Sequence, residues 1–225
     1  MKNILVVGGS RGIGKAVVER LDANIHVISR NEINDKKEGV NYIVADACDE
    51  NIELNFDALD SVIYCPGTIN LKPFTSLKRA DFDHDMEVNF FGAVNVIQKS
   101  IKLLKKSENA SVVLFSTVAA KIGMPFHASI ASAKSAIEGL TKSLAAEYAP
   151  KIRFNCIAPS LTDTSLASKL LSNEKVKENS INTNPMKMIG DPNDIASMVE
   201  WLISDEAKWF TGQIINFDGG MSSIK

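Results

Sequence analysis

Glycines between a predicted strand and a predicted helix indicate a phosphate-binding turn near the start of the chain. The apolar run Asn3–Val7 predicts the strand, and Gly12–Leu21 predicts the helix. Glycine allows a tight turn, a close approach of the backbone to a pyrophosphate and close packing of helix on strand, and the helix N-terminus supplies N–H groups and a positive dipole end. We therefore expect a dinucleotide to bind at the turn, which consists of Gly8, Gly9, Ser10, Arg11, Gly12, Ile13 and Gly14.

The charge at the end of the second predicted strand bears on which dinucleotide binds. The chain there reads Ile28-Ser29-Arg30-Asn31, without the acidic side chain near Ser29 that would bind a ribose 2′-hydroxyl in an NAD site. Arg30 can instead form paired hydrogen bonds with a 2′-phosphate, and Arg11 in the glycine turn can reach the same group. The two arginines favour NADP(H) over NAD(H); the alternative is that both are solvated surface charges.

Short β-branched runs alternate with longer helical segments along the chain. The predicted strands are Asn3–Val7, His26–Ser29, Asn41–Ala45, Ser61–Tyr64, Ser111–Ser116, Arg153–Ala158 and Gln213–Phe217. The predicted helices are Gly12–Leu21, Phe82–Leu104, Ser132–Tyr148 and Pro192–Leu202. Several strands are apolar throughout, as in sheets that are covered on both faces. The alternation predicts a single-domain α/β protein over residues 1–225, with a doubly wound parallel sheet of the Rossmann type.

Composition excludes several other classes of protein. Of the 225 residues, 45 % are hydrophobic, enough for one core, and 25 basic against 27 acidic side chains give a net charge of −2. This balance provides no basic surface for nucleic acid or for an anionic membrane. The first apolar run is too short for a signal peptide or a membrane span, and the three widely spaced cysteines suit a reducing compartment, so we expect a cytoplasmic protein. The residue spacing predicts no metal site.

The least regular stretch of the sequence is Ser160–Gly190, which is polar, rich in predicted loops and contains Pro185. It follows the sixth predicted strand, so it would overhang the carboxyl edge of the sheet, where ligands of such folds bind. We expect a substrate lid there; the alternative is a solvated loop.

Further motifs, in the correct order over nearly the whole chain, make the sequence resemble the short-chain dehydrogenase/reductase family. The glycine spacing is G-x-x-x-G-x-G, and Thr211-Gly212-Gln213 and Asp218-Gly219-Gly220 are similar to the family's carboxyl-terminal signature. The resemblance implies the predicted fold and a nicotinamide dinucleotide. Besides the glycine turn, it implies cofactor contacts at Asp46, Ala47, Cys65, Pro66, Gly67, Asn89, Lys134, Pro159, Thr162 and Thr164.

The resemblance also implies a catalytic site in which one residue is replaced. In the family, a Tyr that donates the proton stands four residues before a Lys that binds the ribose, and a Ser thirteen residues before the Tyr binds the substrate oxygen. Here the Lys is Lys134, the Ser is replaced by Thr117, and the Tyr is replaced by Ile130. Thr117 keeps a hydroxyl, whereas Ile130 has no proton to give. We expect cofactor binding to survive and proton transfer to need another group.

His127 is the candidate for that group. It lies seven residues before Lys134, where the enoyl-reductase branch of the same superfamily has its Tyr, and a histidine can deliver a proton near neutral pH. The alternative is a half-exposed loop residue after Pro125. Tyr64, at a strand end, and Tyr148, a helix length away, are expected to pack and not to react.

Two functions stay open on these grounds. One is an NADP(H)-dependent oxidoreductase that reduces a carbonyl or a conjugated C=C of a small molecule, with Asn89, Thr117, His127 and Lys134 as catalytic residues. The other is a catalytically silent NADP(H)-binding sensor or the inactive partner of a related subunit. In either case the resemblance implies a homo-oligomer, either a dimer or a tetramer.

Overall fold

Seven parallel strands form one sheet in the order β3-β2-β1-β4-β5-β6-β7. The computed structural model describes residues 1–224. The strands are β1 Asn3–Val7, β2 Asn24–Ser29, β3 Asn41–Val44, β4 Ser61–Tyr64, β5 Ala110–Phe115, β6 Ile152–Pro159 and β7 Ile214–Phe217. The chain order reverses between β1 and β4, which pair from Ile4–Ser61 to Val7–Tyr64. The predicted doubly wound parallel sheet is confirmed, and this reversal marks the edge where such sheets bind ligands.

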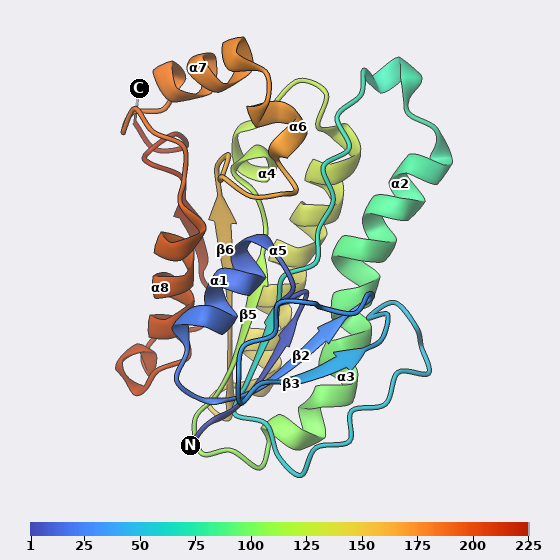
Figure 1. Cartoon of the computed structure of the whole chain (residues 1–225), viewed down its shortest axis with the longest axis vertical. Coiled ribbons are helices and arrows are strands. Elements are labelled where there is room, and N and C mark those ends of the chain that lie inside the picture. The colour runs from blue at the N-terminus through green and yellow to red at the C-terminus, as the bar shows by residue number, and fades with distance from the viewer. Residues whose placement is uncertain (225) are drawn as a thin grey trace.

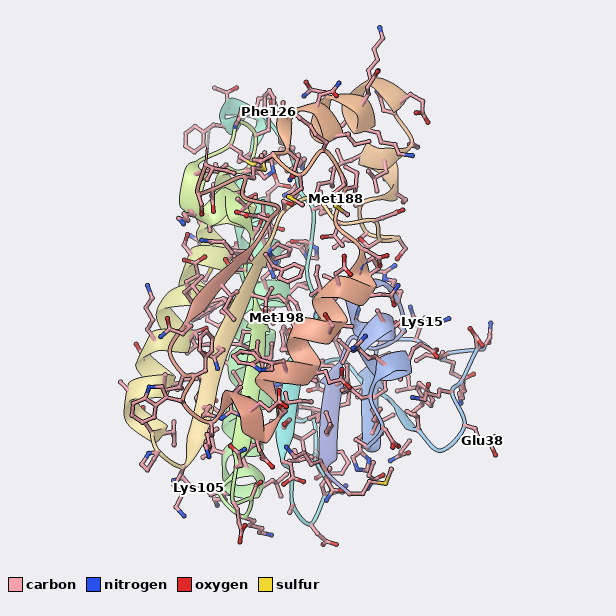
Figure 2. All side chains as sticks on the ribbon, turned by 90° about the vertical axis from the view of Figure 1, so that its left-hand side faces the viewer. Lys15, Glu38, Lys105, Phe126, Met188 and Met198 are labelled. Carbon is pink, nitrogen blue, oxygen red and sulfur yellow. The ribbon has the colours of Figure 1, made fainter. Side chains whose placement is uncertain are left out.

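Helices cover both faces of the sheet (Figure 1). Their bounds are α1 Gly12–Arg20, α2 Arg79–Met86, α3 Gly92–Leu104, α4 Val118–Ile122, α5 Ala128–Tyr148, α6 Ser168–Leu171, α7 Glu174–Thr183 and α8 Pro192–Leu202. The buried residues of α3 and α5 pack on one face, and those of α1 and α8 pack on the other. Figure 2 views the molecule from the side of α8, with Lys15 of α1 and Met198 of α8 labelled. Because both faces are covered, the central strands are apolar along their length.

The long helix predicted over Phe82–Leu104 is divided in the structure. A turn of π-helix, Glu87–Phe91, separates α2 from α3. A π-turn inserts one extra residue into the helical hydrogen-bond ladder, and such turns are frequent at functional sites. Here the inserted turn contains Asn89, which is 1 % exposed. The apolar periodicity that predicted one helix does not register a single extra residue, so the prediction missed the division.

The helix predicted to begin at Ser132 begins four residues earlier. The loop before it ends at Phe126, which has a positive φ of 68°, and His127 stands at the N-cap of α5. Small residues at the start of the helix carry little apolar signal, which explains why its first turn was missed. As a result Ile130 lies inside the helix, one turn before Lys134.

Residues 160–190 are more regular than predicted, because they contain α6 and α7. Asn173 caps α7 by accepting a hydrogen bond from the Val176 amide at 3.3 Å. The two ends of the segment are tied together by a parallel bridge between Thr162 and Gly190. The helices lie beyond the carboxyl end of β6 (Figure 1), so the segment overhangs the edge of the sheet as expected.

Residues 1–224 contain neither a candidate membrane-spanning helix nor a candidate metal site. None of the helices there has both the length and the apolar character needed to cross a membrane. No three His, Cys, Asp or Glu side chains in this part of the chain are grouped so that they could hold a metal ion.

Candidate active site

The glycine turn connects β1 to α1 in a conformation that only glycine permits. Gly8 has a φ of +78°, and its amide donates a hydrogen bond of 2.8 Å to the Ile28 carbonyl on β2. A Cβ on Gly14 would lie 2.3 Å from the Gly8 carbonyl oxygen, closer than any side chain tolerates. The start of α1 therefore lies directly against the turn, with its N-terminal amides directed at the carboxyl edge of the sheet.

The N-terminus of α1 lacks a side-chain cap. Arg11 stands at the N-cap position, and its side chain forms no capping hydrogen bond. The first amides of a helix have no acceptor within the helix, and the aligned peptide dipoles make this end positive. A phosphate group has oxygen atoms that can accept hydrogen bonds from these amides and a negative charge that interacts favourably with the positive end of the helix.

A cavity of about 290 Å³ extends from the turn along the ends of β2 and β3. It brings together eight of the residues predicted to contact a dinucleotide: Gly8, Ser10, Arg11, Arg30, Asp46, Ala47, Pro66 and Gly67. Arg11 and Arg30 are both exposed at its border. Tyr64 is 3 % exposed, lines the same cavity and donates a hydrogen bond of 2.7 Å to the Val88 carbonyl. Burial raises its pKa, so Tyr64 packs beneath this cavity as an uncharged phenol.

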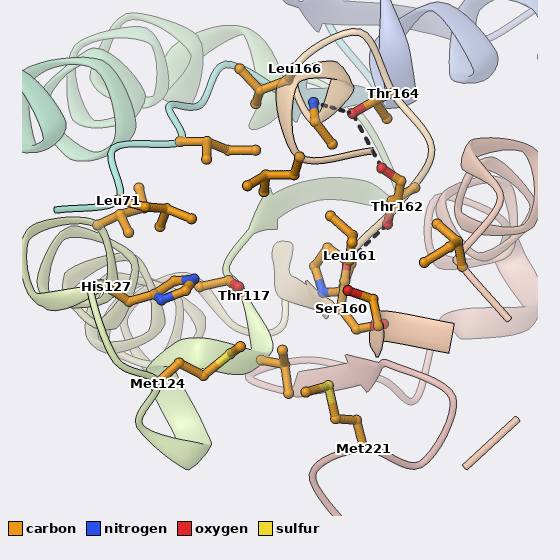
Figure 3. A pocket seen from close by; sticks show the side chains of 18 of the residues that line it. Leu71, Thr117, Met124, His127, Ser160, Leu161, Thr162, Thr164, Leu166 and Met221 are labelled. Atoms are coloured by element: carbon orange, nitrogen blue, oxygen red, sulfur yellow. Dashed lines mark hydrogen bonds between the residues drawn. The ribbon is translucent and has the colours of Figure 1, made fainter. Parts of the chain in front are cut away.

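A larger cavity of about 400 Å³ lies at the ends of β5 and β6 (Figure 3). It is lined by the candidate catalytic residues Thr117, His127 and Lys134. It is also lined by predicted cofactor contacts from four separate elements and loops, namely Ile13, Cys65, Pro159, Thr162 and Thr164. Gly12 and Gly14 line neither cavity, but a Cβ on Gly12 would lie 3.3 Å from Thr164, so the turn touches the wall of this one.

Lys134 is a buried cation at the inner wall of the larger cavity. Its side chain is mostly inaccessible, and Nζ donates a hydrogen bond of 2.9 Å to the Phe115 carbonyl at the end of β5. Burial lowers its pKa to about 8, partly offset by nearby groups that include Asp85. Nζ lies 3.5 Å from where a Cβ on Gly67 would be, so the ammonium lies beside the loop after β4.

Ile130 and Thr117 line the same cavity as Lys134. Ile130, one turn earlier on α5, is 5 % exposed. Thr117 is the N-cap of α4, and its Oγ1 accepts a hydrogen bond of 3.3 Å from the Ala119 amide. Because its oxygen takes part as an acceptor in that cap, the hydroxyl proton of Thr117 is left to donate toward the cavity.

His127 is oriented by one backbone hydrogen bond. Its Nδ1 lies 2.7 Å from the Pro125 carbonyl oxygen. A carbonyl oxygen can only accept, so Nδ1 carries the proton of that bond and Nε2 is the nitrogen left to meet a ligand. Figure 3 shows the ring beside Thr117 in the lining of the larger cavity.

Asn89 is held in one orientation by two residues that the sequence did not reveal. Its Nδ2 donates to Thr68 Oγ1 and to the Asp85 carbonyl, both at 2.8 Å. Thr68 in turn donates a hydrogen bond of 2.6 Å to the Asp85 carboxylate, which is wholly buried. The amide oxygen Oδ1 of Asn89 is buried without a hydrogen-bond partner among the described residues, and it lies 3.4 Å from where a Cβ on Gly67 would be.

A family model described as enoyl-(acyl carrier protein) reductase matches residues 8–222. The chain belongs to the short-chain dehydrogenase/reductase family. A tropinone reductase homologue from Datura stramonium is 35 % identical over 242 residues, covering 96 % of this chain and 90 % of the relative. As an oxidoreductase family member with a Rossmann-type nucleotide-binding fold, the protein carries its cavities where the fold predicts them.

Solved structures of the family agree with the fold. The ligand-free aldohexose dehydrogenase of Thermoplasma acidophilum superposes with a TM-score of 0.92 at 27 % identity, covering 98 % of this chain and 94 % of that one. ElxO with NADP bound superposes with a TM-score of 0.89 at 26 % identity, covering 99 % of both chains.

This short-chain dehydrogenase/reductase therefore brings nearly all predicted site residues to one edge of its sheet. The sequence did not indicate the other cavity-lining residues of the segment 160–190, beyond Thr162 and Thr164, or the pair Thr68 and Asp85. Asp85 precedes Asn89 by one helical turn, and this spacing was the one signal that could have identified it.

Proposed function

We propose that this protein is an NADP(H)-dependent oxidoreductase that reduces the carbonyl or conjugated C=C of a small molecule, with His127 as its proton donor. The observation that carries the proposal is the larger cavity, in which Lys134, Thr117 and His127 border one space next to the glycine turn. In this proposal residues 1–225 form one domain, and residues 160–190 are its substrate lid.

The donor set of the two cavities fits a nicotinamide dinucleotide. The turn has the bare backbone that a pyrophosphate needs, since a Cβ on Gly14 would meet the Gly8 carbonyl, and the unpartnered Oδ1 of Asn89 needs a donor. The amides of the glycine turn would hold the phosphates, with Asp46 and Ala47 around the adenine. Lys134 would bind the nicotinamide ribose. Pro66 and Gly67 would contact the dinucleotide from the smaller cavity, and the nicotinamide would be bordered by Ile13, Cys65, Pro159, Thr162 and Thr164.

The preference for NADP(H) over NAD(H) is supported by Arg11 and Arg30, which border the smaller cavity where a 2′-phosphate would lie. The acidic side chains of Glu32 and Asp46 border it as well. A guanidinium binds a phosphate through paired, charge-assisted hydrogen bonds, so the two arginines outweigh the two carboxylates only if both reach the phosphate. ElxO, which this chain resembles over its whole length, has NADP bound.

Thr117 and His127 have separate roles in the proposed reduction. When bound, the reduced dinucleotide supplies a hydride to the substrate carbon, and the substrate oxygen gains an electron pair that needs a proton. Thr117 donates a hydrogen bond that orients this oxygen. Nδ1 of His127 keeps its proton on the Pro125 carbonyl, so Nε2 of the imidazolium gives up its proton to the oxygen and the ring becomes neutral. The ring is half-exposed, so it regains a proton from water.

Ile130 is the reason for assigning the proton to His127. In this proposal Ile130 occupies the place of the family's proton-donating Tyr, one turn before Lys134 and facing the same cavity. An aliphatic side chain there neither gives a proton nor polarises an oxygen. Lys134 and Asn89 remain to bind the cofactor, so loss of the Tyr would change the chemistry of the site and not its occupancy.

The test follows NADPH absorbance with a panel of ketones, enoyl thioesters and quinones, comparing the wild type with His127→Phe. We expect His127→Phe to lower kcat by about 10²–10⁴-fold, the usual contribution of a positioned acid, with the NADPH Kd unchanged. The matched control is His84→Phe, because His84 is exposed on α2 and lines neither cavity. An unchanged rate in His127→Phe would remove His127 from the mechanism. A wild type that binds NADPH and reduces nothing in the panel would instead be a silent sensor or inactive partner subunit.

We extend the proposal to a dimer or tetramer in the cytoplasm. Two exposed aromatic side chains support an interface: Phe91, which is 51 % exposed next to α3, and Trp209, which is 97 % exposed. The thiols of Cys48, Cys65 and Cys156 are unpaired within the described part of the chain, in keeping with a reducing compartment. Light scattering after size-exclusion chromatography tests the assembly, and a monomeric mass would contradict it.

A further inference from the structure

The larger cavity has few groups that could accept a charge on its ligand. Of its lining residues, only Cys65, His127 and Lys134 are ionisable. Burial raises the pKa of Cys65 to about 12, so its thiol is neutral. Lys134 is hydrogen-bonded to the Phe115 carbonyl and lies against Gly67, on the side of the cofactor loops. This leaves His127 as the single titratable group for the body of a substrate.

The rest of the lining consists of aliphatic, thioether and neutral polar side chains together with Phe115. Six of its larger apolar side chains come from four separate parts of the chain: Leu71, Met124, Leu166, Leu170, Met188 and Met221. Figure 3 labels Leu71, Met124, Leu166 and Met221 in the lining, together with His127 and Thr117. The segment 160–190 contributes both apolar and neutral polar side chains to this lining. Such walls favour ligands that bring apolar surface out of water.

Helix α7 shows how charged side chains are kept out of the cavity lining. Its cavity-lining residues are Val176, Asn179, Ser180 and Thr183, whose spacing of three, four and seven puts them on one face. Its charged residues all lie outside the lining: Glu174, Lys175, Lys177 and Glu178. The other charged residues of the segment 160–190 also lie outside it: Asp163, Lys169 and Lys187. The charged residues of the segment 160–190 therefore all lie outside the lining, and the segment is neutral toward the cavity.

Because the charged residues of the segment 160–190 lie outside the cavity lining, we infer that the substrate is a neutral compound with an apolar body attached to its reducible group. It carries no carboxylate, phosphate or ammonium group. The inference rests on the proposed function for the reducible group. In this proposal His127 meets the reducible group and Lys134 the cofactor, so a charged group elsewhere on the substrate would lose its hydration without gaining a counter-ion, which strongly opposes binding.

The test uses a matched pair of ligands: the methyl ester of a medium-chain oxo acid and the same oxo acid as its free carboxylate. Calorimetry measures the Kd of each for the full-length protein, both with and without NADPH, and NADPH absorbance is followed in parallel. We expect the ester to bind at least about tenfold more tightly than the carboxylate, since only the latter must bury a charge. Equal affinities, tighter binding of the carboxylate or binding of neither compound would overturn the inference.

Two lysine variants test whether the proposed lid produces the preference for the ester over the carboxylate. Met188 lines the cavity at the end of the molecule that also carries Phe126 (Figure 2), whereas Met186, two residues earlier, lies outside the lining. Both side chains are exposed, by 46 % and 64 %, so a lysine at either position removes little core packing. Met188→Lys is expected to reduce or reverse the preference for the ester, and Met186→Lys to leave it unchanged. Identical behaviour of the two variants would mean that the lid surface does not set the preference, contrary to the inference.

The two proposals fail in different ways. Preferential binding of the ester without NADPH oxidation would leave the substrate inference standing and refute the proposed reaction. NADPH oxidation that requires the carboxylate would support the reaction and overturn the neutral, apolar substrate.

Discussion

Lys134 reaches from α5 to the backbone carbonyl of Phe115 at the end of β5, with 2.9 Å between Nζ and the oxygen. The bond fixes a cation at the carboxyl edge of the sheet, where the side chain is 7 % exposed. Burial lowers its pKa to about 8, so the group titrates close to physiological pH. The charge that is available to a dinucleotide at this point therefore depends on pH.

The first prediction concerns that charge. The Lys134 ammonium is present below its pKa of about 8 and lost above it, so the affinity for NADPH should fall as the pH rises from about 7 to about 9.5. Fluorescence titrations at a series of pH values would measure the Kd. Lys134→Met should bind more weakly, with a Kd that stays level over the same range. A wild-type Kd that is equally level would show that the ammonium does not take part in binding.

The second prediction restores a proton donor at position 130. Ile130 lines the cavity one turn before Lys134, so the phenol of Ile130→Tyr would project into the same space. Made in the His127→Phe background, which lacks the proposed donor, this substitution is expected to raise the rate of ketone reduction about 10²–10⁴-fold, measured by NADPH absorbance. Ile130→Phe is the matched control, because it has the same ring without the hydroxyl. Equal rates in the two variants would mean that the position is not within reach of the substrate oxygen.

The third prediction concerns the glycine turn. In Gly14→Ala the new Cβ would meet the Gly8 carbonyl at 2.3 Å, so α1 has to move away from the turn and the phosphate site is lost. We expect NADPH binding to be abolished and the melting temperature to fall. Gly139→Ala, on the exposed surface of α5 with nothing within 4 Å of the new Cβ, should retain binding. It should also raise the free energy of unfolding by about 0.5–1 kcal/mol, the difference in helix propensity between glycine and alanine.

The fourth prediction separates the two nicotinamide dinucleotides. If Arg30 holds a 2′-phosphate, Arg30→Ala loses a charge-assisted contact worth about 1.5–3 kcal/mol, which raises the NADPH Kd by roughly 10–100-fold. The NADH Kd should change little, because NADH has no phosphate there. Arg79→Ala serves as the control, since Arg79 is exposed on α2 and pairs with Asp83. Equal losses for NADPH and NADH would count against recognition of the phosphate.

Much of the fold and of the cofactor site follows from local sequence. Every predicted strand is present with boundaries that differ by at most two residues, because a run such as Ser61–Tyr64 is buried on both faces and must be apolar throughout. The glycine turn could also be predicted from the sequence, because the positive φ of Gly8 and the close contact between Gly14 and Gly8 involve residues that are near one another in the chain. Such requirements act over one turn of chain, and a sequence displays them directly.

The composition of the larger cavity depended on the tertiary structure. Its walls come from the loops after several strands and from α7, and which side of α7 faces inward is decided by the packing of residues 160–190 on the sheet edge. The buried chain from Asp85 through Thr68 to Asn89 joins residues 17 and 21 positions apart in sequence. Hydrogen bonds between distant residues leave no periodic signal. The sequence by itself thus determined that a Rossmann-type fold would form and where its glycine turn would lie, whereas only the folded chain decided what lines the larger cavity, because that surface is assembled from segments whose meeting no local pattern encodes.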